Sequence, residues 1–222
     1  MFDNIKVYSC QLALFVSAGA IRADELSFAI RSKMDVGEFE PMLIPESPGM
    51  PDEFPRLSIN TPKGYKLSMS KARIDFLIDL PLGVDEQEFN EFKTACKVLC
   101  SILDEKGFKF SRVGFVKTLF ESMPRATQFL VQDIARLALQ DSTDFSMTIS
   151  AKRKYEKWGC NSIYSLSNGL RSGSEVGLVV ARDVNIGPEN EVALVPTDVD
   201  GFLSFAEAEC SVENLRKFIE GK

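Results

Sequence analysis

A chain of 222 residues is long enough for one large domain or for two smaller ones that pack together. Its net charge of −6, from 26 basic and 32 acidic residues, gives no overall attraction to nucleic acid or to an anionic membrane. Histidine is absent, which excludes histidine-containing catalytic triads, histidine-ligated zinc and proton transfer by imidazole.

The first predicted element is a strand over residues 5–16, where successive side chains alternate between two faces. A helix is expected over residues 22–34, because apolar residues recur every fourth position from Leu26 to Met34. Residues 37–55 contain five prolines and are predicted to form a long loop, of the kind that serves as a binding element or a lid.

The next predicted elements are a hairpin, a helix and a strand. The hairpin joins strands over residues 56–60 and 65–80 through a turn that contains proline and glycine. The helix is expected over residues 85–107, where Asp85 and Glu88 form a capping box at its start. A long alternating strand is expected over residues 108–120.

The rest of the chain is predicted to add a helix, four strands and a last helix. The first helix follows Pro124, because proline favours the first helical turn. The four strands and the last helix are expected over residues 145–155, 162–166, 176–185, 192–199 and 211–219.

These elements predict an α+β fold with a mostly antiparallel sheet and helices on one face. Residues 1–122 follow the order strand, helix, strand, strand, helix, strand, which is that of a ferredoxin-like α/β sandwich. Residues 123–222 form a second α+β half that packs on the first or continues it as one domain. In both halves a long strand leads into a helix and then into a hairpin, and this predicts a pseudo-duplicated chain.

The cysteines indicate a reducing compartment. Their number, five, is odd, and no Cys-x-x-Cys motif is present, so we expect free thiols and a cytoplasmic location. Residues 12–20 form a short apolar run that ends like a signal-peptidase site, which leaves export as the alternative. No apolar run approaches the ~20 residues that span a bilayer, so no membrane partner is predicted.

One short motif carries a metal-binding hypothesis. Asp198 and Asp200 lie two residues apart at the end of the strand expected over residues 192–199. Residues two apart on a strand point to the same face, so both carboxylates could hold Mg²⁺ or Mn²⁺ if a third ligand completed the site. The alternative is that the two acids only mark the end of a strand.

Two basic groups carry a nucleic-acid hypothesis, since cations beside aromatic rings suit single strands or nucleotide phosphates. The first group and the aromatic residue beside it are Lys152, Arg153, Lys154, Lys157 and Trp158. The second group lies in and after the first hairpin and consists of Lys63, Lys66, Lys71 and Arg73. The alternative is a solvated hairpin end, where lysine also discourages unwanted strand pairing.

The sequence favours a non-catalytic intracellular protein-interaction module, such as an accessory, antitoxin-like or phage–host conflict protein. The proline-rich loop over residues 37–55 and the exposed strand faces are the expected contact surfaces, and another protein is the expected partner. Binding of nucleic acid or nucleotides through the basic groups is the first alternative. A metal-dependent phosphoesterase that uses Asp198 and Asp200 is the second. No cofactor is predicted, and the oligomeric state and the identity of the partner stay open.

Overall fold

The computed structural model describes residues 2, 4–86, 91–139, 141–171, 174–187, 189–190 and 192–220. In chain order the elements of the first half are β1 (Lys6–Ala18), α1 (Ala23–Lys33), β2 (Met42–Leu43), β3 (Leu57–Asn60), β4 (Tyr65–Met69), β5 (Arg73–Val84), α2 (Glu91–Asp104) and β6 (Lys109–Ser122). Those of the second half are α3 (Ala126–Gln128), the π-helix η2 (Phe129–Ile134), β7 (Ser146–Tyr155), β8 (Trp158–Arg171), β9 (Glu175–Ile186), α4 (Pro196–Glu209) and α5 (Val212–Glu220).

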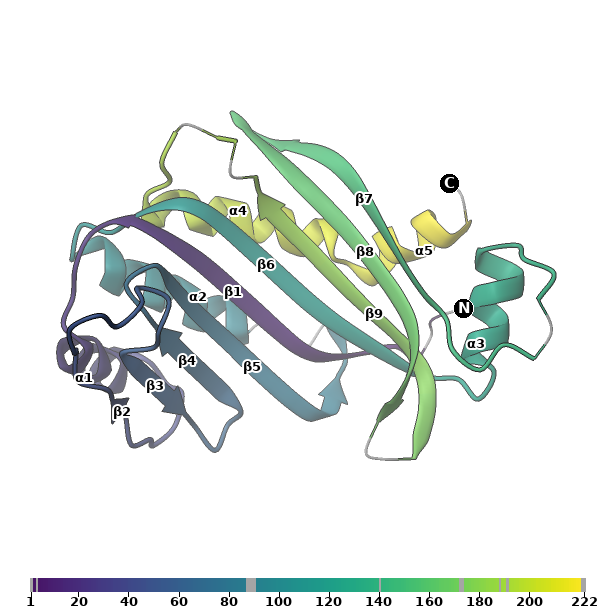
Figure 1. Ribbon diagram of the computed structural model, residues 1–222, viewed down its shortest axis with the longest axis horizontal. Coiled ribbons are helices and arrows are strands. Elements are labelled where there is room, and N and C mark those ends of the chain that lie inside the picture. Colours follow the sequence, from purple (N-terminus) through teal and green to yellow (C-terminus); the bar gives the residue numbers. More distant parts are fainter. Residues whose placement is uncertain are drawn as a thin grey trace.

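The strands form one antiparallel sheet of nine strands in the order β2-β3-β4-β5-β1-β6-β9-β8-β7. The two long strands β1 and β6 lie side by side at its centre, with Leu12 opposite Phe115. The expected division after residue 122 falls at the end of β6, yet β6 pairs from Gly114 to Ser122 with β9 of the second half. The α+β class and the antiparallel sheet are thus as predicted, and the sheet runs through both halves (Figure 1).

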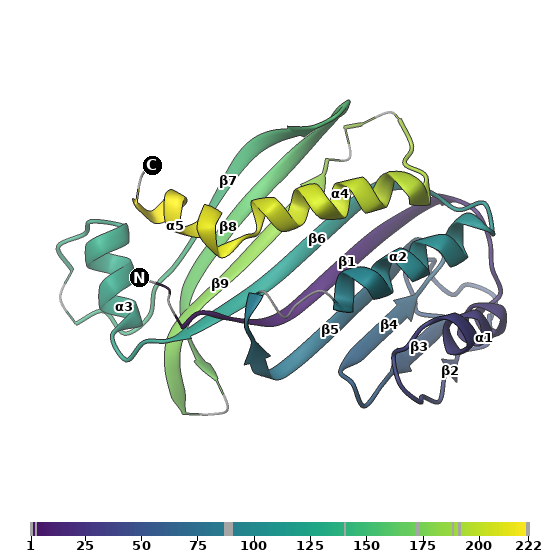
Figure 2. The ribbon, with the colours of Figure 1, turned by 180° about the vertical axis from the view of Figure 1, so that it is seen from behind.

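Helices α2, α4 and α5 lie on one face of the sheet (Figure 2). Helix α2 packs against α4, while α1 packs against α2 and β3. Aromatic contacts fix this layer to the strands: Phe92 of α2 stacks on Phe76 of β5, with ring centroids 5.4 Å apart, and Phe218 of α5 stacks on Tyr164 of β8 at 4.0 Å. The alternating side chains that face these helices, such as Leu12 and Leu14, are fully buried.

The ferredoxin-like order of residues 1–122 is not confirmed, because the expected strand over residues 65–80 is two strands, β4 and β5. The chain reverses at Ser70, whose backbone N donates to Arg73 O at 2.8 Å and whose hydroxyl accepts from Arg73 N at 2.9 Å. One additional reversal changes the direction of the following strand, so β5 runs antiparallel to β1.

The strand expected over residues 192–199 is wrong, because helix α4 begins at Pro196. Val199, Phe202 and Ala206 are buried at helical spacing, and the proline stands in the first turn, where its missing N–H costs no hydrogen bond. The other expected helices are present as α1, α2, α3 with η2, and α5. The capping-box residue Glu88 lies outside the described residues.

In the part of the chain that the structure describes, no helix combines the length and the apolar character needed to cross a membrane.

Candidate functional site

A groove of about 940 Å³ lies at one end of the sheet, between the start of α1 and the proline-rich loop. Its floor comes from the end of β1 and from Phe108, just before β6. One wall is the connection from β1 to α1, with Ala20, Ile21 and Ala23, and the other is the loop segment Leu43–Glu46. Most of these side chains are apolar, which is typical of a site that buries part of a ligand.

Glycine shapes the floor of this groove, because the β1–α1 connection passes directly against Phe108. Gly19 has φ +104°, a conformation that residues with a side chain rarely adopt. A Cβ at this position would lie 2.6 Å from the Cα of Phe108, too close for any side chain. Glycine is therefore required for the chain to turn from the central strand into α1 and leave the groove open.

The proline-rich loop is anchored on both sides of its tip. Arg31 of α1 donates to Phe39 O at 2.7 Å, and the backbone N of Ile44 donates to Arg56 O at 3.0 Å. The guanidinium of Arg56 then donates to the carbonyls of Phe54 at 2.6 Å and Pro51 at 3.1 Å. Because these anchors hold residues 39–44 and 51–56, the tip at residues 45–50 projects between them beside the groove.

Six charged side chains line the groove, namely the cations Arg22, Arg56 and Lys71 and the carboxylates Asp24, Glu25 and Glu46. The Arg56 side chain is 6% exposed, and its Nε lies 3.6 Å from Glu46 Oε1. Lys71 Nζ lies 3.2 Å from Glu46 Oε2. At the mouth, the guanidinium of Arg22 holds the pKa of Asp24 below its ordinary value. A single loop carboxylate therefore bridges two cations on the wall, one of them buried.

The first basic group lies on β7 and the turn after it, and acidic neighbours partly neutralise it. Lys152 Nζ lies 3.3 Å from Glu189 Oε1, and Arg153 Nε lies 3.4 Å from Glu209 Oε2. A backbone hydrogen bond at Glu189 and, after it, the Lys152 side chain lower the pKa of the Glu189 carboxyl. Lys154 is exposed on the same edge strand. The net positive charge along β7 is thus smaller than the number of its basic residues suggests.

Trp158 does not provide the exposed ring that the sequence led us to expect. It is 1% exposed, and its indole Nε1 donates to Val192 O at 3.1 Å. Tyr155 stacks beside it with ring centroids 5.8 Å apart, and Lys157 Nζ lies 4.6 Å from the Trp158 centroid. The indole is therefore a core residue, because the hairpin folds its ring inward under the helical layer.

The second basic group lies at the opposite side of the sheet. Lys63 pairs with Asp35 at 2.8 Å, Lys66 pairs with Asp79, and Arg73 pairs with Asp75 at 2.6 Å. Five strands separate β4 from β7 in the sheet order, so the two groups are about 29 Å apart at ~4.8 Å per strand spacing. The structure does not bring the two groups together, and nucleic-acid binding stays a prediction.

The aspartates of the metal hypothesis diverge on α4. Residues two apart on an α-helix point about 200° apart, so Asp198 and Asp200 do not share a face. Asp198 Oδ2 accepts from the backbone N of Val195 at 2.9 Å, and Asp200 Oδ1 lies 3.0 Å from Lys97 Nζ. Among the described residues, no group of three or more Cys, Asp or Glu side chains could hold a metal ion.

The sheet face opposite the helices carries both polar and apolar side chains. Gln11 donates to Asp75 at 2.8 Å across β1 and β5, and Asn161 donates to Asn185 at 3.0 Å across β8 and β9. Leu77, Val116 and Ile163 are partly exposed on the same face. Of the expected contact surfaces, the proline-rich loop is the one that borders an apolar hollow.

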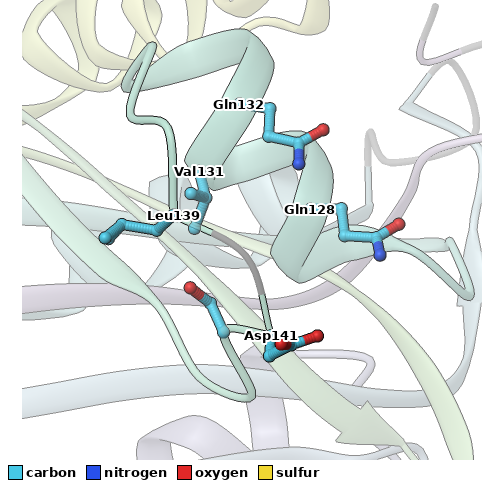
Figure 3. Close-up of a pocket in the computed structure, with 6 residues that line it drawn as sticks. Gln128, Val131, Gln132, Leu139 and Asp141 are labelled. Atoms are coloured by element: carbon cyan, nitrogen blue, oxygen red, sulfur yellow. The ribbon is translucent and has the colours of Figure 1, made fainter.

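A smaller pocket of about 320 Å³ lies beside η2 (Figure 3). Gln128 and Gln132 of the helical segment and Asp141 of the following loop surround it, with Val131 and Leu139 in the wall. A π-helix is frequent at functional sites, but this pocket contains no buried charged side chain and has about a third of the volume of the groove.

The proline-rich loop and Lys71, a member of the second basic group, were singled out from the sequence as binding elements, whereas Arg56 and the β1–α1 connection were not. Arg56 is predicted only as the first residue of a strand, and the start of the β1–α1 connection, up to Ala20, only as the end of a run that resembles a signal-peptidase site. No periodic pattern indicates that Arg56 is buried, because its partners are carbonyls of the loop folded back upon it.

The chain matches no model of a known protein family, and a search of curated proteins finds no match either.

Proposed function

We propose that this protein is a non-catalytic protein-interaction module whose binding site is the groove beside the proline-rich loop. The observation that carries the proposal is the groove itself, which combines a volume of about 940 Å³ with apolar walls and one bridged cationic pair. Hollows of this size bind ligands, and large apolar surfaces open to solvent mark interaction sites.

Exposed apolar side chains on the loop support a protein partner. Met42 is 64% exposed, Leu43 45% and Phe54 45%, all on the loop that borders the groove. Leu43 also lines the groove, so a partner that fills it would cover this side chain. The prolines of the loop restrict its backbone, which limits the conformational entropy that it loses when it binds.

Affinity purification from the cell that makes the protein, followed by mass spectrometry, tests this proposal. We expect Leu43→Glu to reduce recovery of the partner at least tenfold, because it introduces a charge into an apolar wall. Leu170→Glu is the matched control, since Leu170 is 67% exposed near the tip of the β8–β9 hairpin, outside the groove. Equal losses in both variants contradict the proposal.

The same purification also addresses the nucleic-acid alternative. Co-purifying nucleic acid that is retained by Leu43→Glu and lost by the triple variant Lys152→Ala, Arg153→Ala, Lys154→Ala would replace the groove with the β7 edge as the functional surface. Because these three cations lie on β7 and do not line the groove, we expect the triple variant to keep its protein partner.

We also propose that the chain is pseudo-duplicated, with the two units meeting before β6 rather than after it. The order β1, α1, β3, β4, β5, α2 is matched by β6, α3, β7, β8, β9, α4. Outward from the centre, β5, β4 and β3 flank β1 as β9, β8 and β7 flank β6. Co-expression of residues 1–107 and 108–222 as two separate chains tests this proposal. We expect the two fragments to assemble into one complex, and fragments that do not assemble argue against it.

A further inference from the structure

The carboxylate of Glu46 fills a position that suits a carboxylate from another molecule. Its two oxygens lie 3.6 Å from Arg56 Nε and 3.2 Å from Lys71 Nζ. Arg56 Nε is buried without a hydrogen-bond partner, since 3.6 Å exceeds the ~2.9 Å of a normal N–H···O bond. The buried guanidinium therefore retains one donor for an acceptor that approaches more closely than Glu46 does.

The loop tip that holds Glu46 is weakly attached. Within residues 45–50, Met50 N donates to Ser47 O at 3.2 Å, a bond internal to the tip. The polar contacts described between the tip and the rest of the protein are those of Glu46 with Arg56 and Lys71. The Glu46 side chain is 59% exposed, so solvent screens these ion pairs and they contribute little to holding the tip.

We propose that the groove binds an extended segment of another protein in which a glutamate lies among apolar residues, and that this glutamate replaces Glu46 on Arg56 and Lys71. The inference rests on the proposed protein-binding function. Charge complementarity selects the acid: Asp24 and Glu25 of the lining pair with Arg22 and Lys106, which leaves the two cations Arg56 and Lys71 facing the carboxylate of Glu46. The apolar neighbours of that glutamate fit the walls at Ile21, Leu43 and Ile44.

Glu46 then acts as a tethered competitor. A group attached to the same chain has a high effective concentration at its site, so a partner must displace it before its own carboxylate binds. Removal of the Glu46 charge leaves Arg56 and Lys71 available and lowers the cost of binding. We expect about a fivefold gain in affinity, the size of effect that an exposed ion pair supports.

Fluorescence anisotropy with two labelled peptides tests the exchange. The first peptide has the sequence of residues 43–50 of this chain, LIPESPGM, with an amidated C-terminus, and the second has glutamine in place of the glutamate. The proteins are the wild type, Glu46→Gln and the control Glu53→Gln, which changes another exposed glutamate of the same loop. Thermal unfolding verifies that all three are equally folded.

We expect the glutamate peptide to bind Glu46→Gln about fivefold more tightly than it binds the wild type or Glu53→Gln. The glutamine peptide should bind all three proteins with the same lower affinity. Equal binding of the two peptides to Glu46→Gln, or no binding of either, overturns the exchange. The proposed function fails by a different result, namely a native partner that Leu43→Glu does not release.

Discussion

Lys117 of β6 and Arg182 of β9 lie directly opposite each other in the sheet, and both are fully buried on the face that the helices cover. The two cations have partners of different kinds. Lys117 Nζ donates to Glu86 Oε1 at 2.9 Å, whereas Arg182 donates to the carbonyls of Ile163 at 2.8 Å and Glu209 at 2.7 Å. Arg182 thereby stabilises the carboxyl end of α4, where a cation is favourable.

This arrangement predicts that Glu86 matters more for stability than Lys117. Glu86→Gln leaves a buried ammonium without a counter-charge, and we expect it to lower the free energy of unfolding by about 3 kcal/mol. Lys117→Met removes the charge and keeps most of the volume, so its cost should be about 1 kcal/mol. Urea denaturation measures both values, and the reverse order would contradict this assignment of charges.

The buried thiols predict a loss of stability at alkaline pH. Burial raises the pKa of Cys100 and Cys210 to about 12 from the ordinary value of 9.0, and it raises the pKa of Cys10 and Cys96 as well. The unfolded chain releases these protons near pH 9, while the folded chain keeps them, so stability is full below pH 9 and falls above it. We expect the free energy of unfolding to fall by about 1.4 kcal/mol for each thiol and each pH unit between pH 9 and 12. The midpoints of urea denaturation at each pH measure this fall.

The same burial predicts that thiol reagents do not modify the native protein. All five cysteines are free and buried, so iodoacetamide at pH 8 should label them only as fast as the protein opens. Mass spectrometry with increasing urea tests this, and we expect labelling to follow unfolding. Stoichiometric labelling without urea would contradict the described packing.

Two glycines offer a matched test of the groove floor. Gly19→Ala should lower the free energy of unfolding by about 2–4 kcal/mol, because its Cβ would collide with backbone at Phe108. Gly49→Ala in the loop tip shares the positive φ, at +81°, but has no atom within 4 Å of the added Cβ, so about 1 kcal/mol is expected. Similar values for the two variants would show that contact with Phe108 is unimportant.

Asp198 and Asp200 of α4 should contribute differently to the free energy of unfolding, and neither should bind a metal ion. Asp198→Ala removes the acceptor for Val195 N, and a cap of this kind contributes about 1 kcal/mol. Asp200→Ala breaks a half-exposed pair with Lys97, for which about 0.5 kcal/mol is expected. Calorimetric titration with Mn²⁺ should give no binding heat for either variant or the wild type, and heat that depends on both residues would revive the metal hypothesis.

Periodicity predicted the strands and helices whose two faces meet different surroundings. β1 and β6 alternate because one face lies under the helices, and α2 has an apolar stripe because it packs on the sheet. The reversal at Ser70 has no glycine or proline to mark it, since one serine hydroxyl and a backbone bond suffice to make the turn. The strand expected over residues 192–199 is a different case. The buried residues Phe202 and Ala206, whose spacing indicates the helix α4, come after the alternating residues on which that strand prediction rested.

The groove was less predictable than the fold. The prolines of residues 37–55 predicted its loop. Its other wall, the β1–α1 connection, and its buried cation, Arg56, depend on contacts that the sequence pattern does not indicate. Lys71 reaches Glu46 only because the hairpin of β4 and β5 returns to the loop, where Lys71 N also donates to Asp52 O at 3.0 Å. Such contacts follow from the tertiary fold, and no single stretch of residues indicates them.

The central position of β6 has a consequence for synthesis of the chain. β6 ends at Ser122, whereas its partner β9 does not begin until Glu175. While the ribosome adds the intervening residues, one edge of β6 presents unpaired backbone groups beside apolar side chains. Edges of this kind join other chains. Translational pausing within β7 or β8 should therefore promote aggregation, and the nascent chain needs protection there more than the finished protein does.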